Sequence, residues 1–311
     1  MSAVRARVIA WPVEPRRRPR ERWRALRERL APRLPRDARV FQILFLASLL
    51  SLGVLARDFS LRPEQMALTF MAALATQAVF MQTLGLRHRG VLSAVVTAFG
   101  LSILLRADSL WVHPLAAALA IGAKFVVRVG GKHLYNPANL GVVAATTLLP
   151  GAWISPGQWG NDLAFALLFV ALGSTVVARA RRVDIAWVFL GAWLGLVAMR
   201  VALLGQPWAV WMHQLGSGAL LLFAFFMISD PMTIPNDSRG RILYAILVAC
   251  IAYAWAFVAF RPNALPWALF LATPLVPWID RLWPARRYEW QHAPRRRNDR
   301  AMSMAERSDA E

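Results

Sequence analysis

Apolar runs of membrane-spanning length recur along the chain, and they limit its fold more than any other feature. Each run is about 16 to 22 residues long, close to the length of helix that crosses a hydrocarbon layer of ~30 Å. Hydrophobic residues fill 58% of the 311 positions, as expected of this class. The sequence therefore predicts an all-α, polytopic membrane protein with about ten transmembrane helices. The expected spans are 40–56, 64–84, 91–105, 109–129, 138–153, 162–178, 185–204, 208–229, 242–260 and 264–282.

Positive charge is concentrated outside these runs. The formal net charge is +19, and residues 1–39 and 281–311 together hold 21 of the 36 basic residues. Basic tails beside membrane spans follow from the positive-inside rule and from attraction to anionic lipid headgroups. We therefore expect a lipid bilayer and no nucleic acid as partner. The predicted organisation is a basic arm (1–39), a transmembrane domain (40–283) and a basic, polar tail (284–311).

The loops between the expected spans predict the topology. Loops 154–161 and 206–208 contain no Lys or Arg, and they alternate with loops that do. Basic loops face the cytoplasm, so both termini are expected there, in agreement with an even number of crossings. The basic loops contain Arg87 and Arg89; Lys132 and His133; Arg179, Arg181 and Arg182; and Arg239 and Arg241.

Two polar motifs interrupt the apolar pattern, at 130–141 (GGKHLYNPANLG) and at 227–235 (MISDPMTIP). They follow the fourth and the eighth expected spans, so the topology places both at the cytoplasmic face. In each motif an X-Pro step stops helical geometry. Non-helical backbone near a membrane must be buried in protein or line a wet cavity, so the two breaks mark a candidate site. Their similar setting suggests an internal repeat, and the fifth span is either a full crossing or a re-entrant half-helix.

From about Arg39 to Trp290 the chain resembles the D subunit of Rnf electron-transport complexes and the B subunit of the sodium-pumping NADH:quinone oxidoreductase, two branches of one family. The resemblance rests on the first motif, on residues 213–240 and on the segment 274–280 (PLVPWID). The residues that form its structural signature are Asn136, Pro137, Gly141, Asp230, Pro231, Thr233, Pro235 and Gly240.

This resemblance implies a subunit of the bacterial inner membrane that passes electrons within a larger complex coupled to ion movement. Other membrane or soluble redox subunits would be its partners. The sequence contains no P-loop, dinucleotide-binding turn or catalytic triad, so we expect NADH oxidation to belong to another polypeptide. The chain would thus be a carrier subunit, with no catalytic residue of its own.

The resemblance also implies a flavin. In the family, a threonine in the outer loop after the fifth span holds FMN covalently; the corresponding loop here, 154–161, has no threonine, so no covalent FMN is expected. In the sodium-pumping branch, riboflavin lies noncovalently against the first motif, so a noncovalent flavin (riboflavin or FMN) is the cofactor that the resemblance implies for this chain. Lys132 and Asn136 match that site, and His133 stands where that branch has asparagine. The alternative is that Asn136 caps the following helix and Lys132 is a positive-inside anchor.

The sequence is also compatible with other functions. His113 and His213 are candidate axial ligands of a haem. A channel or transporter that kept the fold and lost its redox chemistry would also suit the broken helices, and so would a membrane anchor whose basic tails dock a soluble enzyme. Asp230 is interpreted as a turn that locks its loop, with cation or proton binding as the alternative. Cys250 is expected to be buried, and as the single cysteine it excludes an internal disulfide.

Overall fold

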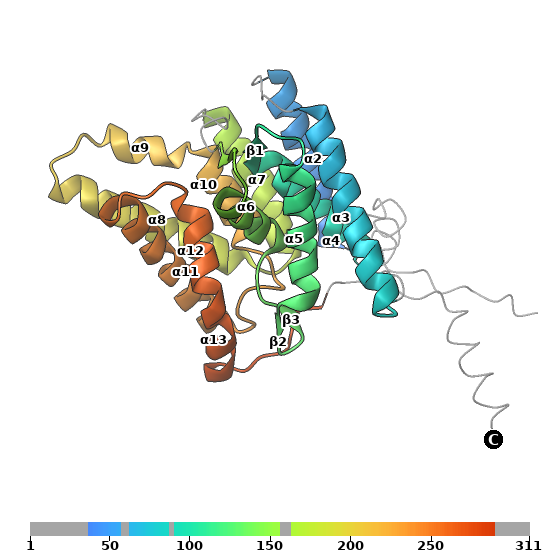
Figure 1. Ribbon diagram of the computed structural model, residues 1–311. Coiled ribbons are helices and arrows are strands. Elements are labelled where there is room, and N and C mark those ends of the chain that lie inside the picture. Colours follow the sequence, from blue (N-terminus) through green and yellow to red (C-terminus); the bar gives the residue numbers. More distant parts are fainter. Residues whose placement is uncertain (1–36, 57–61, 87–89, 156–162, 290–311) are drawn as a thin grey trace, which may run out of the picture. The chain divides into compact units, whose positions relative to one another are not determined.

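The computed structural model describes residues 37–56, 62–86, 90–155 and 163–289 (Figure 1). Residues 1–36 of the predicted arm, residues 290–311 of the predicted tail and most of the outer loop 154–161 lie outside these ranges. The helices of the first half are α2 (Ala38–Ala56), α3 (Pro63–Thr83), α4 (Val91–Leu104), α5 (Val112–Val126) and α6 (Pro137–Leu148). Those of the second half are α7 (Leu163–Arg179), α8 (Val183–Leu203), α9 (Ala209–Leu215), α10 (Gly218–Leu222), the π-helix η2 (Phe223–Met227), α11 (Ser238–Tyr253), the π-helix η3 (Ala254–Val258), α12 (Ala264–Ala272), the 3-10 turn η4 (Thr273–Leu275) and α13 (Val276–Leu282). The strands are β1 (Leu105–Ala107), β2 (Arg128–Val129), β3 (Lys132–His133) and β4 (Ala152–Ile154).

The helices confirm the predicted fold class. Helices α2, α3, α8 and the continuous pair α11–η3 are long and apolar enough to cross a membrane. Helix α9 with α10–η2 forms a further candidate span, bent by 43°, and α4, α5, α6 and α7 are shorter apolar helices. Within the described residues every expected span contains helix, and the four strands are two or three residues long. The chain is therefore an all-α, polytopic membrane protein.

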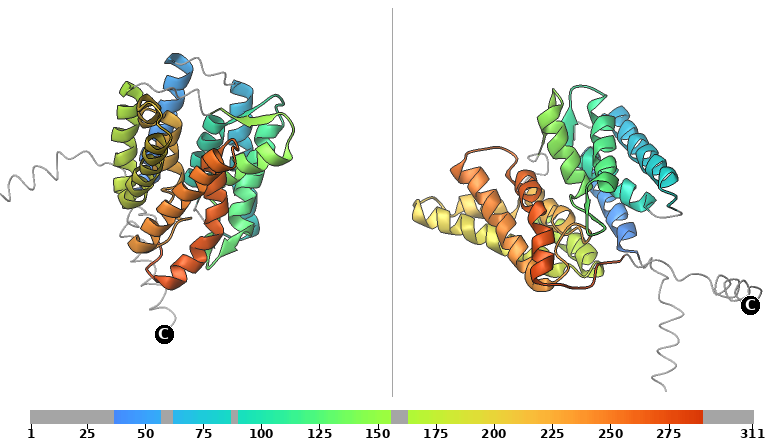
Figure 2. Two further views of the ribbon diagram at one scale, coloured as in Figure 1. Left: turned by 90° about the vertical axis from the view of Figure 1, so that its left-hand side faces the viewer. Right: turned by 60° about the horizontal axis from the view of Figure 1, so that its bottom comes forward.

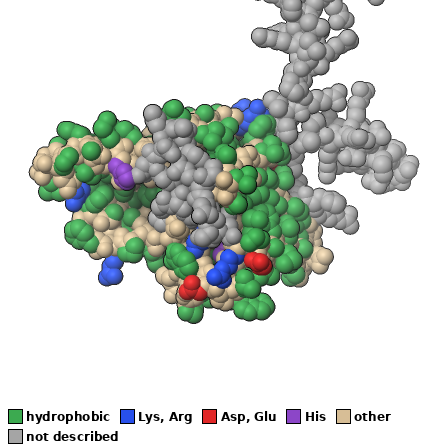
Figure 3. All heavy atoms as spheres, turned by 90° about the horizontal axis from the view of Figure 1, so that it is seen from above, with side chains coloured by type: hydrophobic (Ala, Val, Ile, Leu, Met, Phe, Trp, Pro, Cys, Tyr) green, Lys and Arg blue, Asp and Glu red, His purple; other side chains and the backbone are tan. Residues whose placement is uncertain are grey.

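Helices of each half pack mainly on one another. Helix α3 lies against α4 and α5, whereas α11 lies against α8 and α12 (Figure 2). Contacts of α6 with α12 and of α2 with α7 join the two groups. Seen from the end that carries β1 and α9, the surface not covered by grey atoms is mainly hydrophobic, with few charged side chains (Figure 3).

The short strands show that the fifth expected span runs from one end of the helices to the other, which favours a full crossing over a re-entrant half-helix. Strand β1 directly follows α4, and β4 pairs with it antiparallel at the end of the segment that contains α6. Helix α5 runs from β1 to the β2–β3 hairpin, which lies at the opposite end of the helices (Figure 1). The chain from β3 to β4 therefore passes from one end to the other. Because α6 has only 12 residues, or about 18 Å of helix, extended backbone completes the crossing.

The eighth expected span, 208–229, is divided instead of continuous. Helix α9 ends at Gly216, Ser217 caps α10 by accepting a hydrogen bond from the N–H of Leu220, and the chain then bends by 43°. None of the α9 residues is buried, whereas all five residues of η2 are. Only α10–η2 therefore enters the protein core. Like α6, it is a helix of about half the spanning length.

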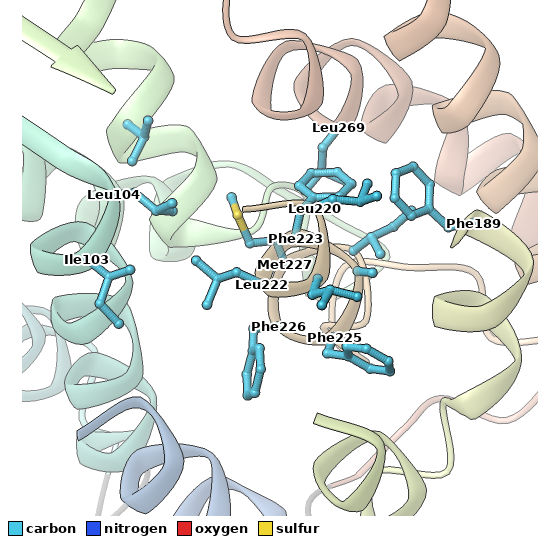
Figure 4. Close-up of a cluster of buried hydrophobic side chains, with 14 of the residues drawn as sticks. Ile103, Leu104, Phe189, Leu220, Leu222, Phe223, Phe225, Phe226, Met227 and Leu269 are labelled. Carbon is cyan, nitrogen blue, oxygen red and sulfur yellow. The ribbon is translucent and has the colours of Figure 1, made fainter. Parts of the chain in front are cut away.

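The hydrophobic core surrounds this half-length helix. Figure 4 shows the side chains of α10 and η2 pointing outward toward the neighbouring helices, with Ile103 and Leu104 of α4 on one side and Phe189 of α8 on another. Phe225 of η2 is fully buried. A π-turn inserts one extra residue per turn, and such turns are frequent at functional sites. Close packing on several sides fixes the end of η2 at Met227, where the second polar motif begins.

Candidate functional site

The two polar motifs meet in space. Asn136, at the start of α6, donates through its amide Nδ2 to the carbonyl oxygen of Met227 at 3.3 Å and to Oδ2 of Asp230 at 3.4 Å. The C-terminus of one half-length helix, η2, thus faces the N-terminus of the other, α6. The structure thereby joins two segments that are more than ninety residues apart in the sequence. Non-helical backbone at both breaks is buried in protein, as a membrane requires.

Asn136 also caps α6. Its Oδ1 accepts a hydrogen bond of 3.0 Å from the N–H of Asn139, and Pro137 occupies the first helical turn, where its missing N–H is harmless. Asn139 in turn donates to the carbonyl oxygen of Pro266 in α12 at 3.1 Å. A Cβ on Gly141 would lie 2.9 Å from the Cβ of Ala120, so glycine allows α6 to pack closely on α5. These motif residues hold the break in place.

Lys132 is the strongest tie between the motifs. Its buried amine donates to the carbonyl oxygen of Ile234 at 2.7 Å, to Oδ1 of Asn236 at 3.1 Å and to Oδ2 of Asp280 at 3.2 Å. Burial lowers the pKa of Lys132, and the Asp280 carboxylate opposes that change. All three N–H donors of the amine are therefore engaged by protein. The side chain is more than a surface anchor, since it clamps the loop 228–237 to β3.

His133 and Asp230 form a buried pair of titratable groups. Nε2 of His133 lies 4.0 Å from Oδ2 of Asp230, and only 9% and 17% of the two side chains are exposed. Burial, followed by the nearby cations Lys124 and Arg128, lowers the pKa of His133 to about 3. Burial also raises the pKa of Asp230, although a hydrogen bond from the Met232 N–H opposes this. His133 is thus a neutral imidazole at pH 7, with one donor and one acceptor.

The other signature residues shape the second loop. Oδ1 of Asp230 accepts from the N–H of Met232 at 3.1 Å, and the hydroxyl of Thr233 donates to the carbonyl oxygen of Asp230 at 3.3 Å. These contacts close the Asp-Pro turn on itself. A Cβ on Gly240 would lie 3.0 Å from the Cβ of Pro235, so the first turn of α11 rests on the end of the loop.

Two cavities flank the junction. The first, which we call the hairpin cavity, has a volume of about 430 Å³ and lies between the β2–β3 hairpin, the loop 228–237 and α13. The second, the central cavity, is about 80 Å³ and lies between α2, α4, α7 and η2. Lys132 and His133 line the hairpin cavity, whereas Asn136 and Asp230 line the central one. The three residues proposed for flavin therefore do not face a single cavity.

Sequence reasoning missed several residues of the junction. Asp280 accepts from the N–H of Asn236 at 2.8 Å and from its Nδ2 at 3.1 Å, in addition to its ion pair with Lys132. Arg241 of α11 donates to Asp184 of α8 at 2.8 Å and to the carbonyl oxygen of Asn236 at 2.6 Å. Asp280 is the last residue of the segment 274–280, which carried part of the resemblance. That segment was the sequence feature that could have identified Asp280 as a residue of the junction.

The remaining candidates lie elsewhere. His113 is buried in α5, where its Nδ1 is 3.0 Å from the hydroxyl of Thr69, whereas His213 lies in α9. Among the described residues no group of three or more His, Cys, Asp or Glu side chains could hold a metal ion. Cys250 is exposed on α11, which makes the prediction of a buried cysteine wrong. Its apolar run was a misleading signal of burial, because only part of α11 is buried in the protein.

Comparison with known proteins gives consistent matches. The model of the NQR2, RnfD, RnfE family matches residues 147–289. The chain is 36% identical over 130 residues to the D subunit of the ion-translocating oxidoreductase complex of Aeromonas hydrophila, covering 40% of this chain and 37% of that protein. It is 42% identical over 69 residues to the protein of the same name from Psychromonas ingrahamii, covering 22% and 20%. The match to the one from Pseudomonas aeruginosa strain LESB58 is 26% identical over 294 residues and covers 72% of this chain and 83% of that protein. The chain thus spans less than two fifths of the first two relatives and most of the third.

Proposed function

We propose that this chain, which belongs to the NQR2, RnfD, RnfE family, is a membrane subunit of an ion-translocating electron-transport complex and carries a noncovalent flavin. Its relatives are named as the D subunit of an ion-translocating oxidoreductase complex, and its helices are those of a multi-pass membrane protein. The observation that carries the proposal is the junction itself: two broken helices meet beside a cavity of about 430 Å³. Cavities of about 300 to 1,000 Å³ are typical of small-molecule sites.

The hairpin cavity fits a flavin in size and in chemistry. The neutral ring of His133 lines it and offers one donor and one acceptor for the polar edge of a planar ring, whereas the hydroxyl of Thr233, which donates to the carbonyl oxygen of Asp230, offers an acceptor. The Lys132 amine and the Asn136 amide are already bonded to protein, so their proposed part is to hold the walls in place. A bound flavin would supply electron transfer in steps of one or two electrons.

The protein contributes burial and fixed dipoles to this site. His133 and Lys132 are 7% and 8% exposed, so the walls exclude water where the motifs meet. In such a low-dielectric site, fixed donors and charges act more strongly on a ligand than they do in water. The clamp from Lys132 to the loop 228–237 would keep these groups in one geometry while the charge of the ligand changes.

The test is a flavin assay on the full-length protein purified in detergent. Acid precipitation should leave flavin in the supernatant, because no covalent attachment is proposed. Ala285 lines the hairpin cavity from an exposed position, so Ala285→Trp should fill the cavity and lower the flavin content. Ala202→Trp, at an exposed position of α8 that lines neither cavity, is the matched control. A protein that stays colourless even when produced with its partner subunits would refute the flavin proposal, and flavin in the pellet would refute noncovalent binding.

We also propose the finer features of location and assembly. The basic loops support an inner-membrane protein with both termini in the cytoplasm, and the relatives' names support association with other redox subunits. A soluble redox partner would be steered by the basic cytoplasmic side, and its binding should weaken at high salt. Unchanged recovery of such a partner in a high-salt pull-down would exclude that mode of docking.

Transport without redox chemistry is the second candidate function. Two half-length helices that end at polar breaks beside the central cavity favour it, because broken helices form the binding sites of many transporters. The discriminating variants are Asn136→Ala and Asp230→Ala. Transport would be supported if both left flavin content unchanged and abolished uptake of a solute into vesicles; loss of flavin with unchanged uptake would exclude it.

A further inference from the structure

The hairpin cavity carries more positive than negative charge. Its lining contains three cations, Lys132, Arg281 and Arg287, and a single carboxylate, that of Asp280. Lys132 and Asp280 are 3.2 Å apart and compensate each other. The guanidinium groups of Arg281 and Arg287 therefore leave the cavity with an excess of positive charge, and no second carboxylate lines it among the described residues.

A tight turn places one of these arginines at the edge of the cavity. Gly130 and Gly131 connect β2 to β3 with φ angles of +55° and +78°, a geometry that L side chains rarely adopt. Arg287 donates to the carbonyl oxygen of Gly130, and Arg128 donates to that of Gly131 at 2.5 Å. A Cβ on Gly131 would come within 2.7 Å of Nη2 of Arg287, so glycine at this position leaves room for the guanidinium group.

The second arginine approaches from α13. The guanidinium carbon of Arg281 lies 4.9 Å from the ring centroid of Trp278, which orients its planar face. Figure 1 shows the β2–β3 hairpin and α13 at the same end of the helices. A guanidinium group has five N–H donors in a rigid fork that matches the oxygens of a phosphate, and a bond to one carbonyl leaves donors for a ligand.

We propose that the hairpin cavity binds a flavin that bears a terminal phosphate, FMN in preference to riboflavin, with Arg281 and Arg287 as the ligands of the phosphate group. This inference rests on the flavin site proposed above and specifies which flavin it holds. A phosphate monoester carries a charge of about −1.5 to −2 at pH 7, which compensates the excess charge of the lining. We expect FMN to bind at least about tenfold more tightly than riboflavin.

The test is a fluorescence-quenching titration of the full-length protein in lipid nanodiscs, with FMN and riboflavin as probes. The double variant Arg281→Gln/Arg287→Gln should lower the affinity for FMN to that for riboflavin and leave the affinity for riboflavin unchanged. Arg261→Gln, at an exposed arginine that does not line the cavity, is the matched control and should leave both affinities unchanged. Because Lys keeps the charge, Arg281→Lys/Arg287→Lys should retain part of the preference for FMN, and it also shows whether the variants fold.

The outcomes separate this inference from the function on which it rests. Equal affinities for FMN and riboflavin in the wild-type protein would overturn the phosphate site and leave the flavin proposal standing. A preference for FMN that survives the double Gln variant would overturn the assignment to these two arginines. Failure of both flavins to bind to the protein would overturn both proposals.

Discussion

Replacing Lys132 should loosen the junction of the two motifs by an amount that its contacts allow us to work out. The side chains of Lys132 and Asp280 are only 11% and 20% exposed, so their ion pair is largely removed from water. Lys132→Met keeps most of the side-chain volume and deletes three hydrogen bonds. Breaking a buried pair by removing one partner costs about 3–5 kcal/mol. Asp280 keeps two donors from Asn236, so we expect the lower end, about 3 kcal/mol.

A double-mutant cycle isolates the ion pair from the other contacts. Asp280→Asn keeps the shape of the side chain and removes its charge, and we expect it to cost about 2 kcal/mol. The double variant should then be about 1–2 kcal/mol more stable than the sum of the single effects predicts, because neither charge is left alone. The measurement is reversible unfolding by SDS in mixed micelles, followed by tryptophan fluorescence.

A distant pair of substitutions provides the control. Glu64 is exposed in the first turn of α3, so Glu64→Gln combined with Lys132→Met should be additive within about 0.5 kcal/mol. The reasoning would be refuted if Lys132→Met cost less than about 0.5 kcal/mol, or if its effect and that of Asp280→Asn were simply additive. The first result would mean that Lys132 contributes little to holding the two motifs together, and the second that its ion pair with Asp280 adds little to its other contacts.

Three further predictions concern neighbouring residues. The pKa of His133 is lowered to about 3, so the unfolded state binds more protons below pH 6.5 and stability should fall as the pH drops from 6.5 toward 3; His133→Gln should flatten this slope in unfolding curves. Asn136→Ala removes a helix cap and leaves the Met227 carbonyl without its side-chain donor, for a loss of about 1–3 kcal/mol in the same assay. Gly141→Ala should destabilise by about 1–3 kcal/mol through overpacking, whereas Gly191→Ala in α8, whose Cβ would meet open space, should be neutral or stabilising; similar effects at both glycines would contradict the packing.

The helices could be predicted from the sequence because a membrane span needs a long apolar run and little else. Expected boundaries such as 64–84 and 185–204 differ from α3 and α8 by one or two residues. The break within the span expected at 208–229 was missed, because Gly216, Ser217 and Gly218 are all tolerated within an apolar run. These residues are compatible with a bend but do not predict one. The bend follows from the packing around η2.

The position of the candidate site in the chain could be predicted from the sequence, but the contacts that its residues make could not. The X-Pro steps correctly marked where polar backbone would need burial. The partners of Lys132, however, lie 102 to 148 residues further along the chain, and no local pattern indicates them. Asn136 caps α6 through Oδ1, as one of its two interpretations expected, and it also donates through Nδ2 to the second motif, which neither interpretation included.

Side chains that already form hydrogen bonds within the protein are not available to bind a ligand. Inside a membrane, each carbonyl and N–H group at a broken helix needs a partner from the protein, since water is scarce there. Lys132 and Asn136 meet that need at the two breaks. A polar motif near the membrane can therefore follow from the break alone, with no ligand. The proposal of a ligand therefore rests on the hairpin cavity, whose lining includes two exposed arginines, Arg281 and Arg287, in excess of its single carboxylate.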